Sequence, residues 1–232
     1  MGFLSRLALG DVEQVSEFPD GLAPVQVDDE GTTLAEMGRG ALRVRVTNAA
    51  GKDVDLICCH LKSKLLSFPG GRFTPRDEGE RARFAGYALY RRAAEAVTLR
   101  AFADRLLAGQ GRERALVVLG DLNDEPTAAT TQILLGPPGS EIGTPGYDRP
   151  DRGDDARLWN LAPLIPPERR FSRVFRGRGE LIDHILVSHA LVNRIDRVDS
   201  GTRPPSITED PTTRRDEPAS DHAPIVARFT LD

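Results

Sequence analysis

The stretch Ala115-Leu-Val-Val-Leu-Gly-Asp-Leu-Asn-Asp124 carries the strongest signal for both fold and chemistry in this chain. Its apolar run has the length of a buried strand and ends at Gly120. Asp121 and Asn123 follow directly, and residues i and i+2 of an extended chain face the same side. A carboxylate and an amide oxygen that point to one spot suit a hard cation such as Mg²⁺. The alternative interpretation is a common turn after a strand.

The composition is that of a soluble globular protein. The chain has 232 residues, of which 39% are hydrophobic and 28% charged, and we expect one domain spanning residues 1–232. No apolar run reaches the length of a membrane span. The net charge of −4 argues against a surface covered by basic residues but permits a local basic groove. Cys58 and Cys59 are adjacent and point to opposite faces of a strand, which fits a reducing compartment, so we expect a cytoplasmic location.

Apolar patterning predicts the main elements on either side of this stretch. Residues 41–47 alternate apolar and polar side chains, and the more apolar residues 54–60 follow after a turn, so we expect an antiparallel hairpin that ends at His60. Residues 78–107 have helical periodicity, as one helix or two, and most of their arginines are expected on a solvated face. Further strands are expected at residues 3–7, 12–18, 171–175, 180–187, 194–199 and 223–231, and a short helix at residues 127–135.

Polar side chains recur at the edges of the predicted strands. His60 ends one strand, Asp183 lies within another, and Asp221 and His222 precede the last one. Buried polar groups without partners are costly, so these side chains should satisfy one another across neighbouring strands. Together with the pair in the opening stretch they make a set of histidines, carboxylates and an amide, which indicates a metal and acid-base site.

Four short motifs in this order resemble the endonuclease/exonuclease/phosphatase superfamily, which has a deoxyribonuclease-I-like fold. They are His60-Leu-Lys-Ser63, Gly120-Asp-Leu-Asn123, Ile182-Asp-His-Ile185 and Ser220-Asp-His222. The resemblance implies an α+β fold: a two-sheet β sandwich flanked by helices, in four αββα layers. It also implies hydrolysis of phosphate esters with Mg²⁺ or Mn²⁺ as the cofactor.

Carried to this chain, the resemblance implies a role for each motif. Asp121 would orient or deprotonate the attacking water, Asn123 would hold that water or the scissile phosphate, and both would lie at the metal with Asp221. His222 would contact the phosphate and help to activate the nucleophile, and Asp183 would fix the tautomer of His222.

His60 would donate to the phosphate or to the leaving oxygen, as the second histidine of the site. We also expect Lys62, Arg72 and Arg76 to bind substrate phosphates. A surface lysine that extends to solvent, and a solvated loop for the arginines, are the alternatives. His184 should face away from Asp183 and lie in the core.

The remaining candidates are expected to be structural. We expect His189 to be exposed in a loop without a role, and Trp159 to anchor the core.

The chain also departs from the family pattern. The family's first strand ends in Asn, and a later segment carries a Gln-Glu pair whose Glu is a principal metal ligand; Glu13, Glu17 and Glu36 do not lie in that context. We therefore expect a domain truncated at its N-terminus relative to the family, or a short form that is weakened, inactive or completed by an oligomer through the exposed N-terminal edge. We expect this polypeptide to bind Mg²⁺ poorly and to hydrolyse phosphate esters slowly or not at all.

The leading functional prediction is a metal-dependent phosphoesterase that cleaves phosphodiester bonds, as a nuclease or phosphodiesterase. Its partner would be nucleic acid or a small phosphodiester. The alternatives are a phosphomonoesterase or lipid phosphodiesterase of the same superfamily, and a binding module that has lost metal chemistry.

Overall fold

The fold is built around a six-stranded mixed sheet, with strand order β1-β4-β5-β6-β10-β7. The computed structural model describes residues 1–147, 149–201 and 220–231. The sheet strands are β1 (Gly10–Glu17), β4 (Glu36–Thr47), β5 (Asp53–His60), β6 (Ala115–Asp121), β10 (Asp183–Ser188) and β7 (Leu158–Asn160). The smaller pairs are β2 (Val25–Gln26) with β3 (Thr33–Leu34), β8 (Arg173–Phe175) with β9 (Arg178–Glu180), and β11 (Ile195–Ser200) with β12 (Ile225–Phe229). The α-helices are α1 (Glu78–Leu107), α2 (Ala129–Leu135) and α3 (His189–Val192), and 3₁₀ turns lie at Pro69–Gly71, Ala162–Leu164 and Pro167–Arg169.

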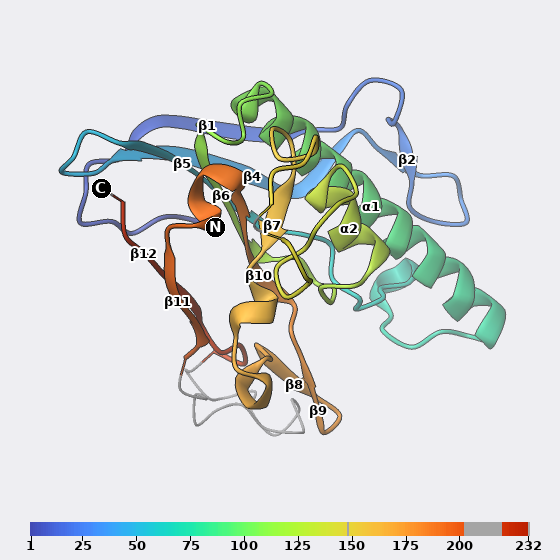
Figure 1. Cartoon of the computed structure of the whole chain (residues 1–232). Helices are drawn as coiled ribbons and strands as arrows, with labels where there is room; N and C mark the ends of the chain where they lie inside the picture. Colours follow the sequence, from blue (N-terminus) through green and yellow to red (C-terminus); the bar gives the residue numbers. More distant parts are fainter. Residues whose placement is uncertain (148, 202–219, 232) are drawn as a thin grey trace.

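Two apolar cores lie on the two faces of this sheet. One core joins the sheet to α1 and α2 and includes Ile57, Leu99 and Leu134. The other joins the opposite face to β11 and β12 and includes Val117, Trp159 and Val187. Figure 1 shows α1 on one side of the sheet and β11 with β12 on the other. The α+β class and the helix-flanked packing of two sheets agree with the predicted fold.

Helix α1 is a single helix over the whole predicted range. The Asp77 carboxylate accepts a hydrogen bond from the Glu80 backbone N–H at 2.8 Å and so caps the N-terminus. Ala108 adopts the left-handed conformation at the C-terminus, and Gly109 follows with φ 70°. The helix therefore begins and ends where its local sequence allows, and it covers one face of the sheet.

The carboxyl ends of β5 and β6 place the polar motifs next to one another. These strands are parallel, with His60 paired to Asp121, and β10 is antiparallel to β6, with Asp183 also paired to Asp121. Gly120 has φ 139°, and a Cβ atom there would overlap the carbonyl oxygen of Cys59. Only glycine fits this close approach, so the residue before Asp121 is dictated by the neighbouring strand.

Two predictions about the first 40 residues are wrong in part. Residues 3–7 form no strand, because the Ser5 hydroxyl accepts a hydrogen bond from the Leu7 backbone N–H and makes a local turn. Strand β4 begins at Glu36, five residues before the start that the alternating pattern predicted. No helix among the described residues has the length and apolarity to span a membrane.

Candidate active site

Three side chains converge at the carboxyl end of β6. Ligand atoms of Asp121, Asp183 and His222 all lie within 4.8 Å of one another. His222 Nδ1 is 2.7 Å from Asp183 Oδ2, and His60 Nε2 is 3.3 Å from Asp121 Oδ2. The four residues come from four segments that are far apart in sequence, and the sheet register brings them together.

The pKa shifts follow from burial and from neighbouring charges. Burial lowers the pKa of His60, and the charge of Asp121 opposes this only partly, so a neutral imidazole is favoured. Burial, followed by the nearby charge of Asp183, raises the pKa of Asp121. The hydrogen bond with Asp183 raises the pKa of His222. The site thus holds a neutral histidine on one side of Asp121 and a histidine that favours its cationic form on the other.

Asp183 is held in place by a residue that the sequence analysis did not single out. The Ser172 hydroxyl is fully buried and accepts hydrogen bonds from the backbone N–H groups of Ile182 and Asp183, both at 3.1 Å. Burial raises the pKa of the Asp183 carboxyl, but its hydrogen bond and charge interaction with His222 and its bond to Ser172 outweigh this and hold the pKa low. Asp183 therefore stays ionised and orients the imidazole of His222.

Asn123 and Asp221 differ in how they relate to this group. Asn123 is buried and left-handed at φ 53°, and its amide Nδ2 donates to the Leu61 carbonyl at 3.0 Å, while its backbone N–H donates to Asp121 Oδ1 at 2.8 Å. Asp221 is half exposed, with Oδ1 3.9 Å from His222 Nε2. The structure thus groups Asp121 with Asp183 rather than with Asp221.

The donor set fits a divalent cation. Two carboxylates, Asp121 and Asp183, lie side by side in a partly buried position, and their mutual repulsion favours a bound positive charge. Oxygen ligands of this kind suit Mg²⁺ or Mn²⁺. The two carboxylates would hold the ion, and the remaining positions would be open to water and to substrate oxygens.

The predicted substrate-binding residues separate into two groups. Lys62 lies beside His60, and its ammonium donates to the carbonyls of Ser63 and Leu65 at 2.9 and 2.8 Å. Arg72 and Arg76 instead surround Glu80, at 2.8 and 3.8 Å, at the start of α1. The structure places Lys62 in a pocket that it shares with His60, and it places the two arginines around a structural carboxylate.

Helix α1 contributes two buried charges, Glu95 and Arg92, and the second comes from the arginines that we expected to be mostly solvated. Glu95 is 2% exposed and accepts hydrogen bonds from the backbone N–H groups of Gly38 and Lys62. Arg92 is 5% exposed; it donates to the Lys62 carbonyl at 3.0 Å and to Asp124 Oδ2 at 3.1 Å. The helix therefore ties the loop after His60 to the loop after Asp121. Sequence periodicity alone could not identify Glu95 and Arg92 as buried, because each of their contacts is with a distant segment of the chain.

The remaining candidates are structural, as expected for two of the three. His184 is buried, with Nε2 2.8 Å from the Asp124 carbonyl and Nδ1 3.2 Å from Asn160 Nδ2. Trp159 is 2% exposed in the core. His189 differs from the prediction: it begins α3, is largely buried, and packs edge-on against Trp159 at 5.3 Å between ring centroids.

Two pockets flank the cluster. The His60 pocket has a volume of about 260 Å³ and is lined by Gly38, Arg39, His60, Lys62, Ser63, Arg91 and Glu95. The Asn123 pocket has a volume of about 390 Å³, and its lining includes Asn123, Phe73, Arg81, Arg173 and Phe175. The first pocket is dominated by charge and the second by apolar side chains.

Comparisons with known proteins agree with this architecture. The chain is similar to the 3′ phosphatase NExo from Neisseria, whose structure was determined bound to product DNA hairpin. The two share 19% sequence identity with a TM-score of 0.52, and the match covers 98% of this chain and 73% of that chain. It is also similar to a functionally unknown conserved protein from Enterococcus faecalis V583, with 14% identity, 97% and 68% covered, and a TM-score of 0.50. At these identities the likeness concerns the fold. No curated protein matches the chain.

A family model identifies the chain more directly. The model described as the Endonuclease/Exonuclease/phosphatase family matches residues 1–222. This range contains all the motifs that form the cluster, from His60 to His222. The chain therefore belongs to the Endonuclease/Exonuclease/phosphatase family.

Proposed function

We propose that this protein is a divalent-metal-dependent phosphodiesterase, and that nucleic acid is its leading substrate class. The observation that carries the proposal is the cluster of Asp121, Asp183 and His222, with His60 against its other side. Such a set provides carboxylates for a cation, a base for water and donors for phosphate oxygens. The activity follows from the chemistry of the cluster together with family membership.

Each residue of the cluster has a chemical task in this proposal. A bound Mg²⁺ or Mn²⁺ would neutralise charge on the phosphate oxygens. Asp121, with its raised pKa, would orient the attacking water and accept its proton, and Asn123 would hold the water or the phosphate. His222, kept cationic by Asp183, would donate to a phosphate oxygen. His60 would donate to the phosphate or the leaving oxygen.

The Asn123 pocket favours a nucleic-acid substrate over a simple phosphomonoester. Phe73 is 69% exposed beside Asn123, and Phe175 lines the same pocket with Arg173 at 4.9 Å from its ring centroid. An exposed ring, Phe73, and a half-buried ring beside an arginine, Phe175, suit the stacking of bases and contact with a phosphate backbone. A lipid phosphodiester or a phosphomonoester remains the alternative substrate.

We further propose that metal binding by this polypeptide is weak in the absence of substrate. The cluster offers two carboxylates, and Mg²⁺ held in this way relies on water and substrate phosphates for its other ligands. A binding module that lost its metal chemistry is the rival proposal, and it predicts that Asp121→Ala leaves the biological activity intact.

The test is hydrolysis by the purified chain with Mg²⁺ or Mn²⁺ of DNA, RNA, bis-p-nitrophenyl phosphate and inositol phosphates. We expect slow, metal-dependent release from the diesters, abolished by EDTA. Hydrolysis of inositol phosphates alone would favour the phosphomonoesterase, and metal-independent hydrolysis would contradict the proposal.

We also propose self-association through the N-terminal edge. Strand β1 lies at the edge of the six-stranded sheet, Val12 on it is 67% exposed, and Leu4 before it is fully exposed. An open strand edge with apolar side chains favours pairing with a second copy. Sedimentation velocity should show a dimer that Val12→Lys weakens; a monomer at all concentrations would contradict the proposal.

A further inference from the structure

We propose that the His60 pocket is a second anion subsite, which binds a phosphate group of the substrate other than the one that is hydrolysed. The inference rests on the proposed function for the identity of the substrate. Three cationic side chains, Arg39, Lys62 and Arg91, line this pocket against one carboxylate, Glu95. The pocket thus has an excess of positive charge immediately beside the carboxylates of the cluster.

Arg39 is the cation that is most available to a ligand. It is exposed on β4, and its side chain has no hydrogen bond or ion pair within the part of the chain that the structure describes. A guanidinium presents a planar fork of donors that matches phosphate. Arg39 can therefore bind an anion without breaking an existing contact.

Lys62 is held in the pocket without a carboxylate partner. Its ammonium donates to two backbone carbonyls, which leaves one of its three donors for a ligand. Burial, followed by the charges of Arg91 and Arg92, lowers the pKa of Lys62. Cations that disfavour one another's charge mark a place where an anion would be stabilised.

Arg91 enters the pocket through a gap left by a glycine. A Cβ atom at Gly38 would overlap the Nη2 atom of Arg91, so a larger residue there would displace this guanidinium from its present position. Arg91 Nε donates to Glu95 Oε1 at 3.2 Å. The Glu95 oxygens also accept from the Gly38 and Lys62 backbone N–H groups. The single carboxylate of the pocket therefore fixes the backbone and the arginine that line it.

His60 belongs to both the pocket and the cluster. It lines the pocket, and its Nε2 lies 3.3 Å from Asp121 Oδ2. An anion in the pocket would thus lie directly beside the phosphate that the cluster acts on. A strand of nucleic acid carries successive phosphates, and this arrangement would bind one of them while the neighbouring one reacts.

Binding of inorganic pyrophosphate tests the subsite without any hydrolysis. Calorimetric titration of the full chain in EDTA should show binding that weakens with added salt. We expect Arg39→Gln and Lys62→Gln each to weaken it about tenfold, because each removes a charge-assisted hydrogen bond. Arg39→Lys should recover part of the affinity. Arg105→Gln, which removes an exposed charge paired with Glu13, is the matched control and should leave binding unchanged.

A second measurement connects the subsite to the substrate. In the wild type, kcat/KM with Mg²⁺ should be about tenfold higher for the trinucleotide TpTpT than for the dinucleotide TpT, and Arg39→Gln should bring this ratio close to one. The inference is overturned if pyrophosphate does not bind, or if the Arg39→Gln, Lys62→Gln double variant binds it as tightly as the wild type. Binding without hydrolysis of any diester would instead overturn the proposed function and leave the subsite in place.

Discussion

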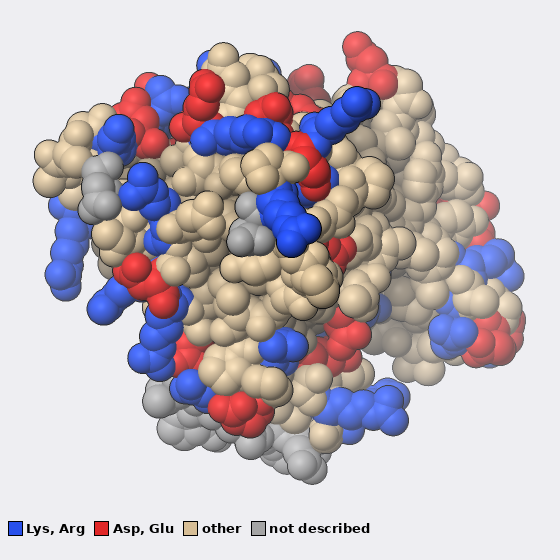
Figure 2. Space-filling model, viewed as in Figure 1, with Lys and Arg blue, Asp and Glu red and all other residues tan. Residues whose placement is uncertain are grey.

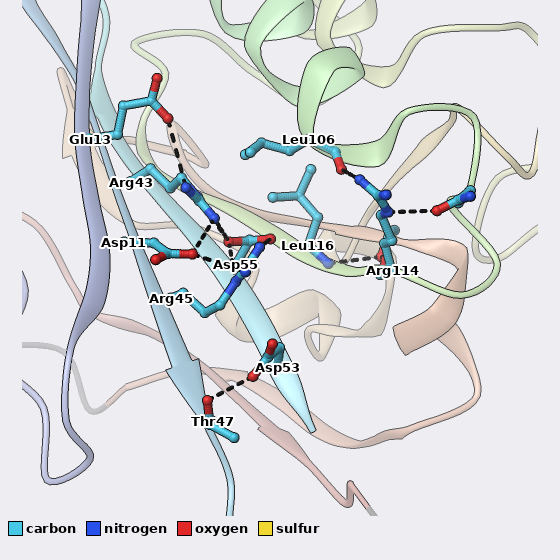
Figure 3. Close-up of polar contacts among 12 residues, drawn as sticks. Asp11, Glu13, Arg43, Arg45, Thr47, Asp53, Asp55, Leu106, Arg114 and Leu116 are labelled. Atoms are coloured by element: carbon cyan, nitrogen blue, oxygen red, sulfur yellow. Dashed lines mark hydrogen bonds and ion pairs between the residues drawn. The ribbon is translucent and has the colours of Figure 1, made fainter. Parts of the chain in front are cut away.

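Strand β5 carries charged clusters at both of its ends, and the two are organised in opposite ways. At its start, Asp55 lies between Arg43 and Arg45 on the sheet face near the end of α1 (Figure 3). At its end, His60 lies against Asp121 and opens the His60 pocket. The first cluster alternates charges of opposite sign, whereas the second places like charges side by side.

In the first cluster each buried charge has a partner. Arg43 Nε and Nη2 donate to Asp55 Oδ1 at 2.8 and 2.6 Å, and Arg45 Nη2 donates to Asp55 Oδ2 at 2.9 Å. Asp11 and Glu13 on β1 complete the group. The hydrogen bond with Asp55 raises the pKa of Arg45, so the network stabilises the charges that it contains. Such a network links the strands β1, β4 and β5, and its buried charges are already neutralised without a ligand.

In the second cluster some charges are paired, Asp183 with His222 and Arg91 with Glu95, but like charges also lie next to one another. Asp121 lies beside Asp183, and Arg39 lies near Lys62 and Arg91. Repulsion between like charges is tolerated where a ligand relieves it, so perturbed groups gather at functional sites. The surface as a whole gives no such signal: Figure 2 shows acidic and basic residues interspersed over the visible face. The pairing of individual charges thus distinguishes the Asp55 network at the start of β5 from the candidate active site at its end.

The strongest test of this contrast is Asp121→Asn. We expect metal-dependent phosphodiesterase activity to fall about 10²–10⁴-fold, because the substitution removes the group that we propose to orient the attacking water. The free energy of unfolding at neutral pH should stay unchanged or rise, since the substitution removes a carboxylate that burial and Asp183 disfavour. Steady-state kinetics and urea unfolding on the same preparation measure both. Unchanged activity would support the binding-module alternative.

At the start of β5, Arg43→Ala on the neighbouring strand β4 should lower stability and leave activity unchanged. It leaves the Asp55 carboxylate buried with a weakened set of partners, which typically costs about 3–5 kcal/mol of stability. Activity per folded molecule should be retained. Arg81→Ala, which breaks an exposed pair with Glu78, is the control and should leave the free energy of unfolding nearly unchanged. Urea unfolding measures the loss in free energy of unfolding for both variants. Equal losses would mean that the buried Asp55 network contributes no more than an exposed ion pair.

Glu95→Gln tests whether α1 positions the site. We expect kcat to fall about tenfold with a smaller change in KM, because a misplaced catalytic loop loses rate even when the substrate still binds. Glu95→Ala should lose more, since glutamine keeps one acceptor for the Lys62 or Gly38 backbone N–H. Kinetics with thermal melts separate positioning from unfolding; a fall in stability at constant kcat would make Glu95 purely structural.

The smallest expected effect concerns a third, fully paired group. The hydrogen bond with Arg157 lowers the pKa of Asp151 from 3.8 to about 2. A carboxyl group with a lowered pKa in the folded protein stabilises the fold at pH values above its pKa in the unfolded chain. This stabilisation is lost as the pH falls through the folded-state pKa. The difference in Tm between the wild type and Asp151→Asn should therefore be present at pH 5–7 and disappear between pH 4 and 2. The effect is small because the pair is partly exposed. A constant difference in Tm down to pH 2 would contradict it.

Much of the fold was predictable from local sequence. Apolar runs marked β5 and β6, and helical periodicity marked α1 over its whole length. The motif residues His60, Asp121, Asp183 and His222 stood at strand edges, where the cost of burying an unpaired polar group indicated that they would meet. That inference needs only the order and spacing of side chains along each strand.

Tertiary structure decided which other residues join the site. Ser172, Arg92, Glu95 and Arg39 carry no local signal, because each acts on a segment at least 10 residues away along the chain. The same reason explains His189, whose burial depends on Trp159. A sequence determines strands and helices through contacts within a few residues, whereas partners for charges depend on which segments the sheet register brings together. The carboxylates of this site and Lys62 could therefore be predicted from the chain alone, and Arg39 and Arg91 beside them only from its fold.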